Sequence, residues 1–230
     1  MSRHRHAPAR ACVAGGTGLV GRAVLARLSA DPRIGAVTAL VRRAGTGLPA
    51  GCTEQVIDFA TLGQPGGAAL PPTDWAICCL GTTIKVAGSQ AAFRAVDFDA
   101  VLAFAGAAKA AGASRLGVVS ALGADPASKV FYNRVKGETE QALTALGFRH
   151  LVIARPSLLL GERKALGQPG RPGERLGQAL MPVFGPLVPR KWRPIDADAV
   201  AAALLAALAA AQRGTTVLES DALLALAAQR

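Results

Sequence analysis

The sequence predicts an α/β fold built on a doubly wound parallel sheet, and two patterns carry this prediction. Short apolar runs, typical of buried parallel strands, alternate with longer runs that repeat apolar residues at helical spacing. A cluster of glycines directly follows the first apolar run, where such folds turn from strand to helix. With 230 residues, 51% of them hydrophobic and 18% charged, the chain is long enough for one large domain with its own core.

Strands and helices are expected to alternate through the first two thirds of the chain. Pro32 ends the first expected helix, and Gly147 suits the end of the third. This alternation favours parallel strands joined by right-handed crossovers. The expected strands are Arg10–Ala14, Ala36–Val41, Glu54–Ile57, Trp75–Leu80, Leu116–Ser120 and His150–Ala154, and the expected helices are Leu19–Ala30, Ser89–Ala111 and Ser128–Leu146.

The alternation stops after Arg155, where residues 156–194 are rich in Pro and Gly. The later elements are expected to be a short helix at Glu174–Met181, a helix at Asp196–Ala211 begun by acidic residues that cap it, a strand at Thr215–Leu218 and a helix at Asp221–Ala228. The expected organisation is a flexible basic tail (residues 1–9) and a single domain (residues 10–230), in which residues 156–230 contribute a small C-terminal substrate lobe.

The glycine cluster has the spacing of a phosphate-binding turn at the start of a helix. Gly15 permits the tight turn, Gly18 lets backbone amides approach a pyrophosphate, and Gly21 lets helix and strand pack closely. The helix N-terminus adds amide groups and the positive end of a dipole. The sequence therefore predicts a dinucleotide-binding Rossmann fold. The expected cofactor contacts in this loop are Gly15, Thr17, Gly18, Leu19, Val20 and Gly21.

Arg42 and Arg43 stand at the end of the second expected strand, where NAD-binding proteins usually have an acidic residue for the ribose hydroxyls. Arginine cannot accept those protons, but it holds a 2′-phosphate through paired hydrogen bonds. We therefore expect NADP(H) as the preferred cofactor and NAD(H) as the second choice; two solvated loop arginines are the alternative. Further cofactor contacts are expected after the third and fourth strands, at Asp58, Phe59, Leu80, Gly81 and Thr82.

The only tyrosine, Tyr132, lies four residues before Lys136 and therefore on the same face of an expected helix. An ammonium beside a phenol favours the phenolate, which suits proton transfer at working pH. Ser120 ends the fifth expected strand, and the carboxyl ends of strands border the ligand crevice in a doubly wound sheet. The three residues predict a site in which a hydroxyl positions a substrate oxygen and the tyrosine exchanges a proton.

The glycine loop, Ser120 and Tyr132-x-x-x-Lys136 resemble the short-chain dehydrogenase/reductase superfamily over roughly residues 10–200. The resemblance implies that Tyr132 is the acid/base, that Lys136 binds the nicotinamide ribose and eases ionisation of the tyrosine, and that Ser120 orients the carbonyl. It further places Arg155 and Pro156 at the cofactor. Four segments are similar to the atypical branch of this superfamily, which includes Tat-interacting-protein-like and NAD-dependent epimerase/dehydratase members. They are residues 119–124, 131–138, 155–157 and 171–175.

The resemblance predicts an oxidoreductase that moves hydride between a nicotinamide and a carbonyl or alcohol carbon. A sugar-nucleotide epimerase or dehydratase is a chemical variant of the same site. One departure keeps a hypothesis of another class open: many dehydrogenases of the superfamily have an asparagine on the fourth helix, and here that stretch reads Phe93-Arg94-Ala95-Val96-Asp97. The alternative is a cofactor-sensing regulatory protein with little turnover.

The net charge of +11 is concentrated in three places: the first ten residues, the pair Arg42-Arg43, and residues 155–193. No aromatic stacking platform, helix-turn-helix or zinc pattern accompanies it, so no nucleic-acid partner is expected. The expected partner is a small-molecule substrate, which residues 155–193 would attract if it is anionic. Docking on acidic lipid or protein, and a merely solvated loop, remain alternatives for this segment.

The remaining features predict location and assembly. The longest apolar run, residues 199–211, is too short to span a bilayer, so no integral membrane segment is expected. The histidines do not converge with other ligands, so no metal is expected. The four cysteines form no CxxC pair, and three lie in apolar runs, which favours buried thiols in a reducing cytoplasm. A monomer and a homodimer are both compatible with the sequence.

Overall fold

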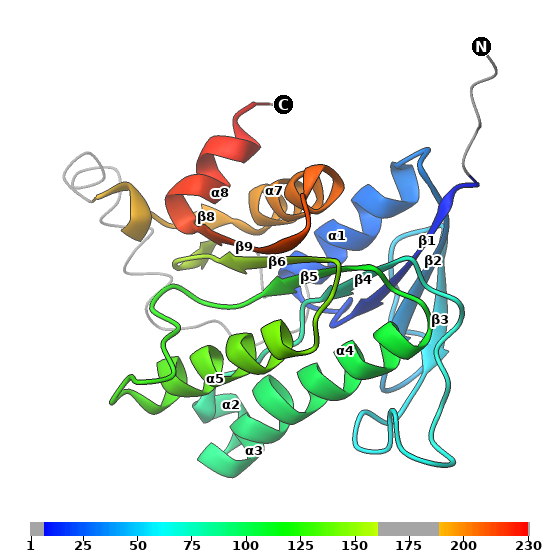
Figure 1. The fold of residues 1–230 in the computed structure, drawn as a ribbon, viewed down its shortest axis with the longest axis horizontal. Helices are drawn as coiled ribbons and strands as arrows, with labels where there is room; N and C mark the ends of the chain where they lie inside the picture. The colour runs from blue at the N-terminus through cyan, green and yellow to red at the C-terminus, as the bar shows by residue number, and fades with distance from the viewer. Residues whose placement is uncertain (1–6, 161–188, 230) are drawn as a thin grey trace.

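The computed structural model describes residues 7–160 and 189–229, shown as a ribbon in Figure 1. Within these ranges seven parallel strands form one sheet in the order β3-β2-β1-β4-β5-β6-β9, and β7 pairs with β8 in a second, two-stranded sheet. Helices lie on both faces of the large sheet (Figure 1). The predicted doubly wound Rossmann fold is therefore confirmed.

The structure gives the following bounds for its elements. The strands are β1 (Ala9–Ala14), β2 (Ile34–Val41), β3 (Cys52–Val56), β4 (Trp75–Cys78), β5 (Arg115–Val119), β6 (His150–Arg155), β7 (Leu159–Leu160), β8 (Ile195–Asp196) and β9 (Gly214–Glu219). The helices are α1 (Leu19–Ala30), α2 (Ile84–Ala87), α3 (Gln90–Arg94), the π-helical η1 (Ala95–Ala100), α4 (Val101–Ala110), α5 (Phe131–Ala145), the 3₁₀ turn η4 (Arg190–Trp192), α7 (Ala197–Ala210) and α8 (Ser220–Ala227).

The central strands end at one common edge of the sheet. Their apolar sequences reflect burial on both faces, as expected for parallel strands covered by helices. The register pairs Ala14 of β1 with Cys78 of β4, Cys78 with Val118 of β5, and Val119 with Ala154 of β6. The loops that carry the predicted site residues therefore leave the sheet side by side, as required for a ligand crevice at the carboxyl ends of strands.

Two apolar cores lie on opposite faces of the sheet. Helices α1 and α7 cover one face, and α4 and α5 cover the other, as Figure 1 shows. An ion pair of 2.6 Å between Arg27 and Asp198 joins α1 to α7. Asp196 begins α7 as predicted, because its side chain accepts a hydrogen bond from the backbone N–H of Asp198 at 2.8 Å.

The C-terminal segment, expected as a small lobe, contributes much of its described part to the large sheet and its core. Strand β9 pairs with β6 from His150↔Gly214 to Arg155↔Glu219 and becomes the seventh strand. Among its described residues, 156–160 and 189–229, the strands β7 and β8 and the turn η4 lie apart from that sheet. The expected helix Glu174–Met181 lies outside the described residues. At the other end of the chain, the last residue of the expected tail, Ala9, begins β1.

The helix expected over Ser89–Ala111 is helical from Gln90 to Ala110, but it is not α-helical throughout. A π-helical turn, η1, separates α3 from α4, and the short helix α2 precedes them. Gly88 ends α2 in the left-handed region, at φ 88°, which glycine adopts without strain. A π turn admits one more residue than an α turn and so changes which side chains face inward; such turns occur often at functional sites. Here the turn carries a fully buried acid, Asp97.

Candidate functional site

The glycine loop after β1 is packed too closely to accept side chains. Gly15 has a φ of 81°, and a Cβ there would lie 2.5 Å from the carbonyl oxygen of Cys79 on the β4 side. A Cβ at Gly21 would lie 2.1 Å from the oxygen of Gly15. Gly18 precedes α1 without a side-chain cap, so the amides of the first helical turn keep room for an anion. This arrangement fits the pyrophosphate of a dinucleotide.

The predicted phosphate clamp lies at the end of β2. Arg42 and Arg43 are both exposed, and neither makes an ion pair within the described ranges 7–160 and 189–229.

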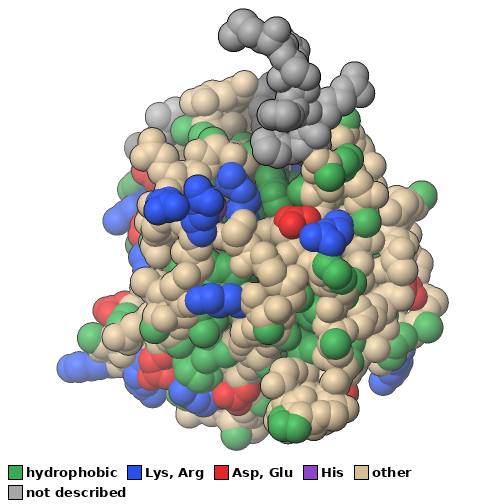
Figure 2. Space-filling model, turned by 45° about the vertical axis from the view of Figure 1, so that its right-hand side comes forward, with side chains coloured by type: hydrophobic (Ala, Val, Ile, Leu, Met, Phe, Trp, Pro, Cys, Tyr) green, Lys and Arg blue, Asp and Glu red, His purple; other side chains and the backbone are tan. Residues whose placement is uncertain are grey.

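On the face drawn in Figure 2, Lys and Arg side chains gather in small separate groups, some of them beside Asp or Glu. The charge therefore does not form one continuous basic stripe on that face.

The loop after these arginines, residues 44–48, is held from two sides. Glu54 on β3 accepts hydrogen bonds from the N–H groups of Gly45, at 2.7 Å, and Thr46, at 3.0 Å. Its hydrogen bonds with Thr46 and Gly45 lower the pKa of Glu54. Arg22 on α1 donates to the carbonyl oxygens of Gly47, at 2.8 Å, and Thr46, at 3.1 Å. The backbone following Arg43 is thus tied to both neighbouring elements.

The other predicted cofactor contacts follow β3 and β4. Asp58 is exposed and caps a turn by accepting from the N–H of Ala60 at 2.9 Å, and Phe59 packs against the core. Leu80, Gly81 and Thr82 form the turn after β4. A Cβ at Gly81 would lie 3.7 Å from Nζ of Lys136, so the β4 turn directly adjoins the predicted catalytic lysine.

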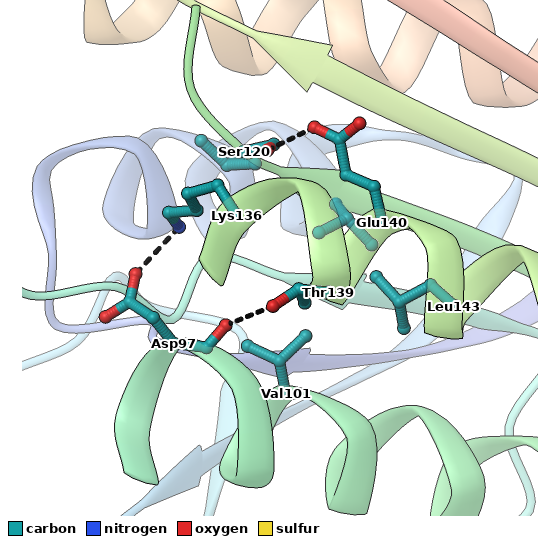
Figure 3. A pocket seen from close by; sticks show the side chains of 9 residues that line it. Asp97, Val101, Ser120, Lys136, Thr139, Glu140 and Leu143 are labelled. Atoms are coloured by element: carbon teal, nitrogen blue, oxygen red, sulfur yellow. Dashed lines mark hydrogen bonds and ion pairs between the residues drawn. The ribbon is translucent and has the colours of Figure 1, made fainter. Parts of the chain in front are cut away.

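Helix α5 presents Tyr132, Lys136 and Glu140 at four-residue spacing. The Tyr132 ring lies 5.3 Å from the ring of Phe93, centroid to centroid, in a tilted arrangement. Figure 3 shows Lys136 reaching toward Asp97, with Nζ 2.8 Å from Oδ1. Both side chains are buried, 7% and 0% exposed. Burial acts to lower the pKa of Lys136, but the charges of Tyr132 and Asp97 and the hydrogen bond to Asp97 together raise it.

Ser120, at the end of β5, donates its hydroxyl hydrogen bond to the buried carboxylate of Glu140 (Figure 3). Arg155 holds the same carboxylate, with Nη2 2.6 Å from Oε2 and Nε 3.1 Å from each oxygen. Its Nη1 lies 3.3 Å from Glu219 on β9. The hydrogen bond with Glu140 raises the pKa of Arg155. The guanidinium expected at the cofactor is therefore already paired with two carboxylates.

Pro156 and Thr17 complete the predicted set. The carbonyl oxygen of Pro156 accepts from the N–H of Leu122 at 2.9 Å, which ties the loop after β5 to the end of β6. Thr17 is exposed at the top of the glycine loop. Leu19 and Val20 lie in the first turn of α1.

A small cavity lies between α5, η1 and the end of β5, as the close-up in Figure 3 shows. It has room for about one water molecule. Its polar lining comprises Asp97, Ser120, Lys136, Thr139 and Glu140. The polar groups around the predicted catalytic lysine are therefore packed against one another rather than separated by an open pocket.

Two acids of this site are missing from the prediction. Glu140 has a recognisable signal, since it lies four residues after Lys136 on the predicted helix face. Asp97 has a weaker one, an acid within an otherwise apolar helical stretch. Its contact with Lys136 joins residues 39 positions apart and depends on how η1 packs against α5.

Two further findings concern metals and membranes in residues 7–160 and 189–229. There, no group of three or more His, Cys, Asp and Glu residues is placed to hold a metal ion. In the same ranges no helix has both the length and the apolarity needed to cross a membrane.

No family model matches the chain, but curated proteins do. FMP52 of Coccidioides immitis is 33% identical over 229 residues, covering 90% of this chain and 88% of that protein. FMP52 of Candida albicans is 31% identical over 196 residues and covers 82% of each chain. Rat HTATIP2 is 40% identical over 139 residues, 60% of this chain and 53% of that protein.

Solved structures share the fold at lower identity. MoeE5 in complex with UDP-glucose and NAD has a TM-score of 0.67 at 17% identity, covering 96% of this chain and 81% of that one. A UDP-N-acetylglucosamine 4-epimerase of Methanobrevibacter ruminantium, in complex with UDP-N-acetylmuramic acid, has a TM-score of 0.67 at 15% identity, with 93% and 77% covered. The likeness confirms the fold class at this level of identity.

The predicted cytoplasmic location is wrong, because FMP52 proteins of several fungi, at 31–37% identity, are named mitochondrial. The prediction rested on cysteines without disulfides, and free thiols indicate a reducing environment without distinguishing one such compartment from another. The similarity to FMP52 extends over most of both chains. The chain therefore belongs to the FMP52 family, whose fold here is that of the atypical short-chain dehydrogenase/reductases with their NAD(P)-binding Rossmann domain.

Proposed function

We propose that this protein is an NADP(H)-dependent oxidoreductase that interconverts a carbonyl compound and its alcohol. The observation that carries the proposal is the closeness of Gly81 to Lys136: a Cβ built on the glycine would lie 3.7 Å from Nζ. The predicted cofactor turn after β4 thus adjoins the lysine that shares a helix face with Tyr132. The pairing of a cofactor turn with an acid/base pair is what hydride chemistry requires.

The cofactor would lie along the carboxyl edge of the sheet. The first turn of α1, approached closely because Gly15 and Gly18 lack side chains, would hold its pyrophosphate through backbone N–H groups. Leu80, Gly81 and Thr82 would line its path, Lys136 would bind the nicotinamide ribose, and Asp58 and Phe59 would border the adenine. A bound nicotinamide would supply or accept the hydride; the protein supplies the proton and the alignment.

The preference for NADP(H) over NAD(H) rests on Arg42 and Arg43. Both are exposed, and neither is paired with a carboxylate in the described chain. The hydrogen bonds from Arg22 and to Glu54 hold the following loop in place. Two open guanidinium groups on a held loop suit the geometry of a 2′-phosphate.

The protein's acid/base chemistry would centre on Tyr132. Its hydroxyl would give a proton to the substrate oxygen in reduction and take one in oxidation, with the charge of Lys136 supporting the phenolate. Ser120 already donates its hydrogen to Glu140, so only its oxygen lone pairs remain for a ligand. Such an oxygen accepts from a substrate hydroxyl, which favours the alcohol as the form that Ser120 binds.

A nucleotide sugar is the second candidate class of substrate. MoeE5, which shares the fold, has been solved with UDP-glucose and with UDP-glucuronic acid, each together with NAD. Oxidation of a sugar hydroxyl at this site would use the same Tyr132 and Lys136.

The test compares wild type with Tyr132→Phe. NADPH oxidation is measured with a panel of aldehydes and ketones, NADP⁺ reduction with alcohols and UDP-sugars, and NADPH binding by calorimetry. The variant should bind NADPH as wild type does but lose turnover by about 10²- to 10⁴-fold, the usual contribution of a general acid.

Thr144→Val is the matched control. It also removes a hydroxyl from α5, and in the described chain that hydroxyl donates only to the backbone carbonyl of Glu140. It should keep wild-type rates. NADPH binding without turnover on any substrate in either direction, or equal rates for Tyr132→Phe and wild type, would contradict the proposal. Binding without turnover would instead support the cofactor-sensing alternative.

A further inference from the structure

Asp97 is a fully buried residue held by three contacts, which come from α5 and from the turn after β4. Its Oδ1 pairs with Nζ of Lys136 on α5 at 2.8 Å, and its Oδ2 accepts from the N–H of Thr82 in the β4 turn at 2.9 Å. Its backbone carbonyl accepts from the hydroxyl of Thr139 on α5, also at 2.9 Å. One residue thus connects the turn expected at the cofactor with the helix that carries the acid/base pair, and Figure 3 shows its contacts with Lys136 and Thr139 on that helix.

Such an arrangement is not explained by stability alone. Removing a carboxylate and an ammonium from water is unfavourable, and well-packed apolar residues often stabilise a fold as well as a buried ion pair does. The chain nevertheless breaks the regular helix with a π turn and places an acid at its inner side. What the pair achieves that apolar packing would not is a fixed position and a fixed charge for Lys136.

Of the charged and titratable groups near the Lys136 ammonium, Asp97 is the one placed to fix its position and its charge. On α5, Tyr132 lies one turn before the lysine and Glu140 one turn after it, but Glu140 is held by Arg155. On β4, Cys78 lies close enough to interact with the ammonium, and its burial raises the pKa of its thiol to about 12, so it is uncharged at neutral pH. Asp97 is the carboxylate in direct contact with Nζ.

We propose that Asp97 is the positioning residue of this site: it keeps Lys136 protonated in a buried place and holds Nζ against the turn after β4. This inference rests on the proposed function, since it assigns Lys136 to the ribose and to Tyr132. Asp97 lies in η1, in the helical stretch where the superfamily resemblance leads one to expect an asparagine. Asp97 itself is not required to touch the substrate.

The decisive variant is Asp97→Asn. It keeps the size of the side chain and an oxygen for the Thr82 N–H, but removes the charge that opposes Lys136. Burial then acts on the lysine without its carboxylate partner, so the pKa of Lys136 should fall. Asp99→Asn is the matched control, since Asp99 lies in the same π turn but is exposed.

Two measurements detect the changed protonation of Lys136 and its consequence for activity. The first needs no substrate: lysine side chains are isotope-labelled, the Lys136 signal is assigned with Lys136→Arg, and its protonation is followed by NMR across pH. In Asp97→Asn the lysine should lose its proton at clearly lower pH than in wild type, and in Asp99→Asn it should not. The second is the pH profile of kcat/KM, in which Asp97→Asn should lose activity by up to about 10²-fold, most strongly on the alkaline side.

Asp97→Glu keeps the charge and should restore most of the wild-type titration; it also provides a folded variant if Asp97→Asn does not fold. Unchanged lysine titration and an unchanged pH profile in Asp97→Asn would overturn the assignment. A lowered lysine pKa in a protein without any turnover would support the positioning role and contradict the proposed function. The two claims therefore fail separately.

Discussion

The carboxyl edge of the sheet holds two pairs of cations in opposite states. Lys136 and Arg155 are largely buried, and each lies against a carboxylate from another element, Asp97 and Glu140 respectively. Arg42 and Arg43 are exposed and make no ion pair in the described parts of the chain. A buried cation needs a partner from the fold itself, whereas an exposed one is stabilised by water and remains available to a ligand. The comparison suggests that position, not the number of charges, separates residues that build a site from residues that await a ligand.

The largest predicted change is a loss of stability in the variant Lys136→Met, which alters a buried cation. The substitution leaves the Asp97 carboxylate buried without its cation, so the free energy of unfolding should fall by about 3–5 kcal/mol. Urea denaturation measures it. Arg42→Met, the same kind of replacement at an exposed position, should stay within about 0.5 kcal/mol of wild type. Similar losses in the two variants would remove the basis of the comparison.

The next effect concerns ligand binding and should be confined to the exposed pair. The double variant Arg42→Ala/Arg43→Ala should lose about 1.5–3 kcal/mol of NADPH affinity, the range of hydrogen bonds to charged groups, with NADH affinity nearly unchanged. Calorimetric titration with both cofactors measures the difference. Arg33→Ala is a suitable control, because Arg33 is exposed just before the opposite end of β2. Equal weakening toward NADPH and NADH would show that the two arginines do not read the 2′-phosphate.

The smallest effect is expected where a charged pair is exposed but already partnered. The hydrogen bond from Arg27 lowers the pKa of Asp198, with burial opposing it. A lowered native pKa means that the pair stabilises the fold above the unfolded-state pKa of about 3.9 and loses this contribution as the pH falls through the native value. Because the Asp198 side chain is 61% exposed, Asp198→Asn should destabilise by only about 0.2–1 kcal/mol at neutral pH.

Urea denaturation of wild type and Asp198→Asn at neutral pH and at stepwise lower pH checks the sign, since Asp198 loses its charge only as the pH falls through its lowered native pKa. The difference between the two proteins should shrink toward zero in acid. A difference that persists there would mean that Asp198 stabilises α7 through packing rather than through its charge.

Local patterns predicted the elements whose ends carry strong signals. Helix α1 has the predicted bounds Leu19–Ala30, because a glycine turn precedes it and Pro32 follows it. The face shared by Tyr132 and Lys136 was predictable because helical spacing alone places both residues on one side of α5. The roles predicted for these residues remain predictions, as do the cofactor contacts.

What the sequence did not predict depends on contacts between distant segments. Helical periodicity continues through residues 89–111 and gives no local signal for the π turn at Asp97, which lies where η1 packs against α5. The partners of Arg155 follow from the fold in the same way: Glu219 comes within reach only because β9 pairs with β6. Ser120 was placed correctly at the end of β5, but its hydrogen bond to Glu140 required the positions of both elements.

The way α7 covers the sheet has a consequence for the order in which the chain can fold. On β5, Gly117 leaves space that Leu204 and Leu208 of α7 occupy, since a Cβ there would lie 3.3 Å from each. The ribosome makes these leucines only after β1 to β6 are complete, so the part of this face that α7 covers stays exposed in the nascent sheet, although α1 is already present beside it. Long-range closure of this kind slows folding and leaves apolar surface exposed in the interval, which is when a folding chain is most prone to aggregate.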